Sequence, residues 1–246
     1  MPTPTSPTLH IGTSGYSYKE WKGEGKFFPP GLSPKKMLAF YAERFNTVEI
    51  NASFYRLPTA DTLKSWAAET PEHFTFTLKA PQKITHFSRL KDVDESVSEF
   101  ITAAQTLKSR RGPLLFGLPP NMKKDTARLE AVLKLLSKHT KSGLRSAFEF
   151  RHASWFDAET FDLLRKHNAA LCIAEADEKL EVPFEPTADW GYIRLRTTKY
   201  TDAQLKAWLQ KIRATDWSEA FIYFKHEDEG TAPKFAAQLI KLAAAK

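Results

Sequence analysis

The feature that most constrains the fold is an alternation of short apolar runs with amphipathic stretches along the whole chain. The short runs are rich in Val, Ile, Leu and Phe and predict buried strands, whereas apolar residues three or four positions apart predict helices. The predicted strands are 9–13, 47–51, 74–79, 113–117, 145–150, 170–174, 190–195 and 220–225. The predicted helices are 33–44, 59–66, 93–108, 126–139, 157–167, 201–213 and 232–245.

Alternating strands and helices imply parallel strands joined by right-handed crossovers. Eight such units in 246 residues predict an α/β fold, a closed, parallel, eight-stranded (β/α)8 TIM barrel. The segment 177–188 is polar and interrupted by proline, so the sixth helix is predicted to be short or missing. We expect one barrel domain over 8–246, preceded by a disordered lead-in, 1–7. The alternative, an open doubly wound sheet, needs a glycine-rich phosphate loop that Gly12-Thr-Ser-Gly15 does not complete.

Polar side chains in the predicted strands keep to one phase. Val48 and Ile50 fall on one face of their strand, and Glu49 and Asn51 fall on the other. Active sites of TIM barrels form at the carboxyl ends of the strands, so such side chains are predicted to converge on one mouth. The other members in this phase are Thr75, Thr77, Lys79, Glu149, Arg151, Arg194, Arg196 and Lys225.

The charges of this set predict a cationic mouth. Five members are Lys or Arg, and two, Glu49 and Glu149, are acids. Fixed positive charge in a cleft attracts anions, so we expect a small anionic ligand, phosphorylated or sugar-like. Lys79, Arg151 and Arg194 are expected to hold the anion, with Asn51 orienting the substrate and Glu49 or Glu149 acting as base. Lys79 is also a candidate catalytic residue. The alternative is a Lys/Arg–Glu network that only holds the barrel interior together.

The loops after the strands add aromatic and hydroxyl groups. The expected ligand-binding set contains Ser14, Tyr16, Tyr18, Tyr55, Trp155 and Arg196 in addition to the anion-holding residues. Aromatic walls around charged groups suit a planar or ring-shaped ligand. Trp21 is equally well explained by packing of the long first loop over the barrel. His86, after the third strand, is a candidate general acid or base, although a lone loop histidine is more often an ordinary surface residue.

Metal binding is only weakly indicated. The acids Glu49, Glu149, Glu175 and Asp177, with His86 and His226, offer oxygen and nitrogen ligands, but no H-x-x-x-H or C-x-x-C spacing joins them. We therefore predict no cofactor, with a divalent metal kept as a weakly supported alternative.

The number of cysteines and the hydropathy of the chain indicate its subcellular location. Cys172 is the one cysteine and lies in the apolar run 169–174, which indicates a core residue and excludes an internal disulfide. No apolar run approaches the ~20 residues of a transmembrane helix, and the N-terminus lacks a signal-peptide pattern. We expect a cytoplasmic protein without a membrane partner; the sequence indicates no oligomeric state.

Several short motifs stand at or just after the predicted strands. They are Gly12-Thr-Ser-Gly-Tyr-Ser-Tyr18 with Trp21, Val48-Glu-Ile-Asn51 with Ser53-Phe-Tyr-Arg56, Phe76-Thr-Leu-Lys-Ala-Pro81 with Thr85-His86, Pro119-Pro120, Glu149-Phe-Arg151 with Ser154-Trp155, and Tyr192-Ile-Arg194. Together these motifs resemble the domain-of-unknown-function family 72, the YecE-like proteins, over nearly the full length. The resemblance implies a TIM barrel, distantly like those of endonuclease IV and xylose isomerase, and carries no established activity. Gly117, Arg196-Thr197 and Lys225-His226 depart from the family pattern, which leaves the ligand least defined at those walls.

Two other functions stay open. The net charge of +7 is compatible with a protein that binds or processes nucleic acid, although the charge is spread along the chain and the metal cluster of endonuclease-like barrels is not reproduced. The third hypothesis is a structural or interaction role, in which the charged side chains of the barrel interior are all paired and no pocket is accessible. Whether the protein is an enzyme is not decided by these patterns.

Overall fold

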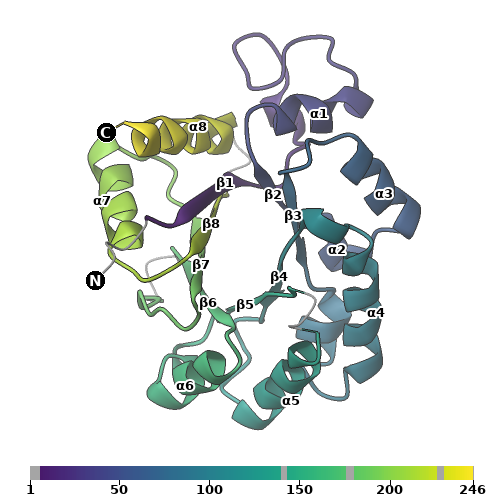
Figure 1. Cartoon of the computed structure of the whole chain (residues 1–246), viewed down its shortest axis with the longest axis vertical. Helices are drawn as coiled ribbons and strands as arrows, with labels where there is room; N and C mark the ends of the chain where they lie inside the picture. The colour runs from purple at the N-terminus through teal and green to yellow at the C-terminus, as the bar shows by residue number, and fades with distance from the viewer. Residues whose placement is uncertain (1–5, 140–142, 176–179, 226–229, 246) are drawn as a thin grey trace.

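Eight parallel strands close into a barrel in chain order, β1 to β8, in the computed structural model (Figure 1). The structure describes residues 6–139, 143–175, 180–225 and 230–245. The strands are β1 Thr8–Ser14, β2 Thr47–Ile50, β3 Thr75–Lys79, β4 Arg111–Gly117, β5 Ser146–Glu149, β6 Ala170–Ala174, β7 Trp190–Leu195 and β8 Glu219–Phe224. The last strand pairs with the first, as when Gly12 lies beside Tyr223, so the sheet has no free edge. The predicted TIM barrel is confirmed.

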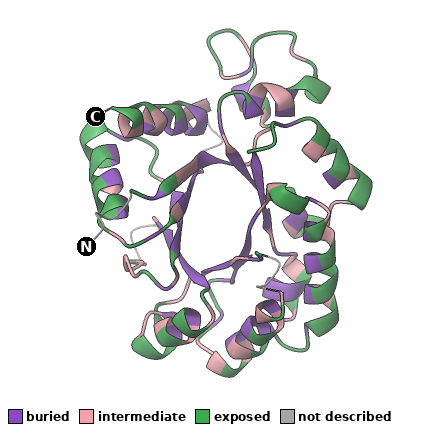
Figure 2. Cartoon of the chain, in the orientation of Figure 1, coloured by how far each residue is buried: buried purple, intermediate pink, exposed green. Residues whose placement is uncertain are grey.

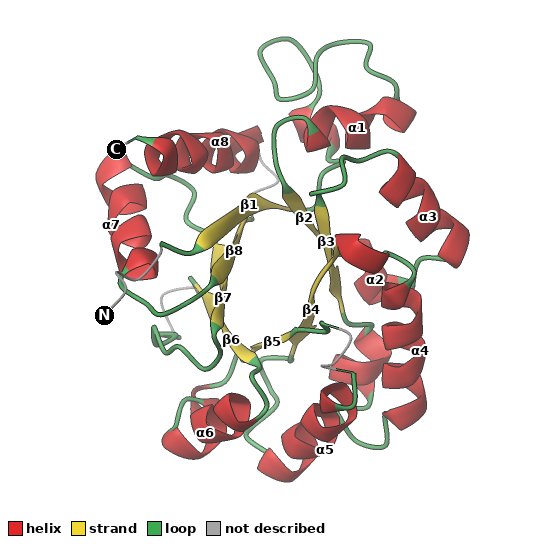
Figure 3. Cartoon of the chain, in the orientation of Figure 1, coloured by secondary structure: helices red, strands yellow, loops and turns green. Residues whose placement is uncertain are grey.

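A layer of helices surrounds the barrel (Figure 3). The α-helices are α1 Met37–Ala42, α2 Ala52–Tyr55, α3 Ala60–Ala68, α4 Asp94–Gln105, α5 Thr126–Ser137, α6 Ala158–Lys166, α7 Asp202–Arg213 and α8 Thr231–Ala244. Between β6 and β7 the described residues 180–189 contain no helix, as predicted for the sixth connection. In the described part of the chain, no helix has both the length and the apolar character needed to cross a membrane.

Side-chain caps explain where several helices begin. Thr201 and Gln204 form a capping box at the start of α7. Asp157 accepts a hydrogen bond from the backbone N–H of Thr160 and so caps α6. The helix predicted over 33–44 begins later: Ser33 makes no side-chain cap bond, and a short 3₁₀ turn, Pro34–Lys36, precedes α1.

Two predicted loops contain short helices, which is a correction. The stretch after β2 forms α2, and the loop after β3 contains a π-helix, Lys83–Phe87. A single helical turn is too short to show a hydrophobic period, so the sequence pattern could not reveal it. Both turns follow strands at their carboxyl ends and border the barrel mouth (Figure 1).

The core has two parts, one outside and one inside the barrel. Most buried apolar side chains lie between the strands and the helices, where Figure 2 shows the inner helix faces buried. A second cluster fills the barrel itself and includes Leu115, Cys172, Tyr192, Phe221 and Tyr223. Cys172 is thus a core residue, as predicted. The packed interior gives the mouth a fixed floor.

Candidate functional site

A buried ion-pair network lies at the centre of the barrel mouth. Arg194, on β7, donates to Glu49 Oε1 from Nη2 at 2.8 Å and to Glu149 Oε2 from Nη1 at 2.9 Å. The two carboxylates come from β2 and β5, on other sides of the barrel. All three side chains have at most 1% of their surface exposed. The guanidinium therefore ties three strands together.

Neutral groups complete the environment of Glu49. The Tyr192 hydroxyl donates to Oε2 at 2.5 Å, and the Ser14 hydroxyl donates to Oε1. Asn51 Nδ2 donates to Ser14 Oγ at 2.7 Å, and Arg194 Nη2 also lies 3.1 Å from that oxygen. Glu49 thus has a partner for each carboxylate oxygen, as a buried charge requires.

Glu149 is shared by three arginines. In addition to Arg194, Arg151 Nη2 donates to Oε2 at 2.9 Å, and Arg196 Nη2 donates to Oε1. Arg151 and Arg196 keep 29% and 25% of their side-chain surface exposed, so both border the solvent-accessible mouth. Positive charge therefore exceeds negative charge around this carboxylate.

Electrostatics keeps both acids ionised. Burial by itself raises the pKa of Glu49, but Arg194, Ser14 and Tyr192 outweigh it and the pKa is lowered. Burial also opposes ionisation of Glu149, yet Arg194, Arg196 and Arg151 hold its pKa well below the ordinary value. A carboxylate with a depressed pKa is a weak base, so the geometry favours the counter-ion role of both acids over the role of base.

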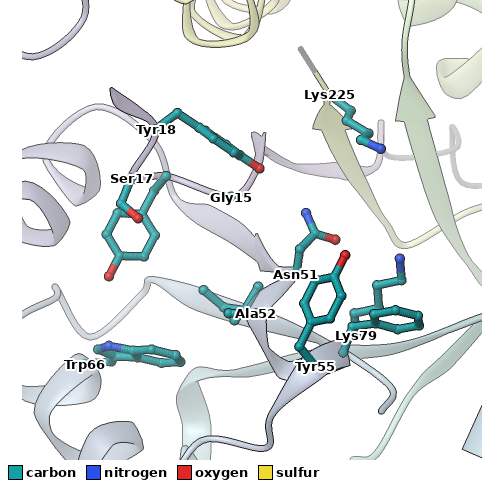
Figure 4. Close-up of a pocket in the computed structure, with 12 residues that line it drawn as sticks. Gly15, Ser17, Tyr18, Asn51, Ala52, Tyr55, Trp66, Lys79 and Lys225 are labelled. Carbon is teal, nitrogen blue, oxygen red and sulfur yellow. The ribbon is translucent and has the colours of Figure 1, made fainter. Parts of the chain in front are cut away.

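An aromatic cavity of about 470 Å³ opens beside this network (Figure 4). Its lining residues are Gly15, Tyr16, Ser17, Tyr18, Ile50, Asn51, Ala52, Phe54, Tyr55, Trp66, Lys79 and Lys225. In Figure 4 the side chains of Asn51, Tyr55, Lys79 and Lys225 extend toward one another across the same space. Within the described chain, neither Lys79 nor Lys225 has a carboxylate within ion-pair distance.

The two lysines differ from the arginines in their ionisation. Burial lowers the pKa of Lys79 to about 8, with Arg194 contributing in the same direction and Glu149 and Glu49 opposing it. Burial also lowers the pKa of Lys225, again assisted by Arg194. At both amines, burial and the neighbouring arginines therefore outweigh the stabilising effect of the nearby carboxylates on the protonated form.

A second cavity of about 800 Å³ lies on the other side of Lys225. Its lining includes Glu149, Arg151, Glu175 and Arg196. Because Lys225 lines both cavities, the mouth has an aromatic half and an arginine half that meet at this residue.

His86 lies at the border of the mouth on the π-helix. Its Nδ1 is 2.9 Å from Thr85 Oγ1, and its ring contacts that of Phe54 edge-on at 4.8 Å. Burial lowers the pKa of His86, and Arg151 and Lys79 lower it further. The imidazole is therefore neutral near pH 7, a state in which it can accept a proton.

The predicted aromatic residues differ in position: some line the cavity, one lies at its rim and one is buried in the core. Tyr16 and Tyr18 line the cavity, although the Tyr18 hydroxyl already donates a hydrogen bond to the Ser14 carbonyl oxygen at 2.8 Å. Tyr55 is 74% exposed at the rim. Trp155 is a correction: it is fully buried, stacks on Phe150 and donates from Nε1 to a backbone carbonyl, so it forms no wall of the mouth.

Trp21 is also fully buried, which agrees with the packing interpretation of the first loop. Lys225 was predicted from strand phase to reach the mouth, and it lines the cavity. Tyr192 and Phe54 were not among the residues predicted to bind the ligand. Tyr192 precedes Arg194 by two positions, so the strand phase could have indicated it. Phe54 lies beyond the end of its strand, where side-chain direction cannot be read from strand phase.

Among the described residues, no group of three or more His, Cys, Asp or Glu side chains is placed to hold a metal ion. Glu175 instead orders the loop after β7, because its Oε2 accepts hydrogen bonds from the backbone N–H groups of Arg196 and Thr197 at 2.9 and 3.1 Å. Asp177 and His226, named with the weak metal prediction, lie outside the described residues.

Comparisons with known proteins agree with this architecture. The chain is 30% identical over 162 residues to the UPF0759 protein YunF of Bacillus subtilis, a match that covers 63% of this chain and 54% of that protein. The chain thus spans about half the length of this curated relative. A crystal structure of a DUF72 family protein from Thermotoga maritima superposes with a TM-score of 0.82 at 25% identity, covering 96% of this chain and 99% of the other.

A xylose isomerase domain containing protein from Salmonella typhimurium superposes with a TM-score of 0.50 at 10% identity, covering 92% of this chain and 97% of the other, and shows a likeness of fold alone. The family model described as "Protein of unknown function DUF72" matches residues 10–246. The chain therefore belongs to the DUF72 family.

Proposed function

We propose that the protein binds a small anionic ligand, phosphorylated or sugar-like, at the mouth of the barrel. The observation that carries the proposal is the contrast between the two lysines and the three arginines. Each of the three arginines forms an ion pair with Glu49 or Glu149, whereas Lys79 and Lys225 line one cavity without a carboxylate partner among the described residues. Two such cations attract an anion that neutralises both.

The shape of the cavity supports the same conclusion. Its volume of about 470 Å³ falls within the range of pockets for small molecules, roughly 300–1,000 Å³. Asn51 offers an amide, and the rings of Tyr16, Phe54 and Tyr55 offer flat apolar surface. A sugar or another ring that carries an anionic group would meet both kinds of surface. Arg151 and Arg196 border the adjoining half of the mouth and are expected to assist.

We predict that Lys79→Met and Lys225→Met each weaken the binding of inorganic phosphate and glycerol 3-phosphate by at least about tenfold, since each removes one charge-assisted contact. Isothermal titration and ligand-dependent thermal shifts measure this, because a ligand that binds only the folded state raises the melting temperature. Lys64→Met removes an exposed lysine on α3 and is the matched control.

Neither variant should unfold the protein, since each removes a partly buried charge that repels Arg194. A wild-type protein that binds neither anion, or equal binding by wild type and both variants, would contradict the proposal. Salt-sensitive binding of an oligonucleotide that Lys79→Met leaves unchanged would instead favour the nucleic-acid alternative.

A further inference from the structure

We infer that Lys79 is a nucleophile that forms an imine with an aldehyde or ketone whose anionic group lies toward Lys225 and the arginine half of the mouth. The inference rests on the proposed function and adds to it a chemical class of ligand, an anionic carbonyl compound, and a covalent step.

The position of Lys79 suits a reacting group. It is the last residue of β3, at the strand end where TIM-barrel chemistry occurs. Its backbone is held on both sides: Ser53 Oγ lies 2.7 Å from the Lys79 carbonyl oxygen, and the next N–H, of Ala80, donates to Leu115 at 2.8 Å. The side chain leaves this fixed point and ends with Nζ 4.5 Å from the ring centre of Phe54, inside the aromatic cavity. A ligand in the cavity therefore meets the amine directly (Figure 4).

The missing side chain of Gly117 gives Lys79 room beside Glu149. A Cβ at this position would lie 3.1 Å from Glu149 Oε2 and 3.5 Å from Lys79 Cε. The lysine stem and the carboxylate thus pass each other over this glycine without an ion pair between them. The negative charge of Glu149 favours protonation of Lys79, but no ion pair with Glu149 neutralises the lysine.

Charged and titratable groups surround Lys79 from several elements. Arg194 and Arg151 oppose its protonation, Glu149 and Glu49 favour it, and His86 lies close enough for its own pKa to be lowered by Lys79. Together with burial they bring the pKa of Lys79 to about 8, against an ordinary value of about 10.4. A useful fraction of the amine is neutral near pH 7, and the neutral form is the nucleophile. Desolvation and neighbouring cations are the two known ways to activate a lysine for imine chemistry.

The step needs no further reactant. The Nζ lone pair adds to the carbonyl carbon, and the carbonyl oxygen takes up a proton from the nitrogen to give a carbinolamine. A second proton converts the hydroxyl into water, which leaves as the C=N bond forms. In sum, Lys–NH3⁺ and O=CR2 give Lys–NH⁺=CR2 and H2O, with atoms and charge balanced. The resulting iminium withdraws electrons from the neighbouring carbon, which is the basis for isomerisation or cleavage there.

The experiment uses two probes that differ only at the reacting group. Pyridoxal 5′-phosphate carries an aldehyde and a phosphate, and pyridoxine 5′-phosphate carries an alcohol in place of the aldehyde. The protein is incubated with the aldehyde at pH 7.5, reduced with borohydride and mapped by peptide mass spectrometry. We expect Lys79 to be labelled at least about tenfold faster than the exposed Lys64, because its lower pKa leaves more neutral amine. The labelling rate should rise to a plateau with a midpoint near pH 8.

Variants separate charge from nucleophilicity. Lys79→Arg keeps the cation but cannot form an imine, so it should bind the alcohol probe and lose the fast labelling. Lys64→Arg should keep both. Labelling of Lys79 at no more than the rate of Lys64 would overturn the inference. If the alcohol probe still binds in that case, the proposed anion site stands and only the covalent step fails; if it does not bind, both fail.

Discussion

Arg194→Met is expected to lower the free energy of unfolding by about 3–5 kcal/mol at pH 7, the usual cost of removing one partner from a buried ion pair. Glu49 then loses the one ion-pair partner that it has among the described residues, while Glu149 keeps Arg151 and Arg196. An uncompensated carboxylate with no exposed surface is the main source of the loss. Urea unfolding of wild type and variant measures the difference.

A second substitution tests this explanation. Glu49→Gln in the Arg194→Met background should recover part of the lost stability, because it removes the unpaired charge and keeps one oxygen that can accept from the Tyr192 or Ser14 hydroxyl. Arg165→Met is the control: Arg165 also pairs with two carboxylates, Asp162 at 2.7 Å and Glu185, but it is 42% exposed, so its removal should cost less than about 1 kcal/mol. A loss of under about 1 kcal/mol in Arg194→Met would show that the network does not stabilise the barrel.

Glu149→Gln is expected to make the free energy of unfolding depend less steeply on pH in acid solution. The pKa of Glu149 is held well below the value of about 4.3 that a glutamate has in an unfolded chain. The stabilisation from its ionised form is therefore fully present above the unfolded pKa and is lost as the pH falls toward the folded one. Glutamine does not titrate, so the variant lacks this loss.

The difference in unfolding free energy between wild type and Glu149→Gln should be constant above about pH 5.5 and then shrink, by roughly 1.5–2 kcal/mol, down to about pH 3. Chemical denaturation at a series of pH values measures it. Parallel curves for the two proteins over this range would mean that Glu149 has the same pKa in the folded and unfolded states.

Much of the barrel follows from local patterns, which is why it could be predicted. Each strand is a short apolar run between helices with clear periodicity, and this pairing of elements has few topological solutions. The strand phase correctly brought Glu49, Glu149 and Arg194 to one end of the barrel. The short turns after β2 and β3 carry no such period and were missed.

The partners within the site could not be predicted, because they depend on register between distant strands. Glu49 and Arg194 are 145 residues apart in the chain, and the sequence left Glu49 as base or counter-ion. Only the geometry showed that Arg194 is paired with two carboxylates, whereas Lys79 forms no ion pair with a described residue. Trp155 was misplaced for a related reason: an aromatic residue after a strand end can turn inward to the mouth or outward to the helix layer, and strand phase does not extend into the loop.

Anion binding at the lysine side of the mouth is the central claim, and tungstate, a tetrahedral oxyanion with strong anomalous scattering, tests it most directly. Crystals soaked in tungstate are predicted to show an anomalous peak within hydrogen-bond distance of Lys79 or Lys225 Nζ, inside the cavity that Tyr55 and Asn51 border. The same peak should be absent from Lys79→Met/Lys225→Met crystals soaked alike. A mouth without a peak, in crystals where tungstate occupies other sites, would contradict the account.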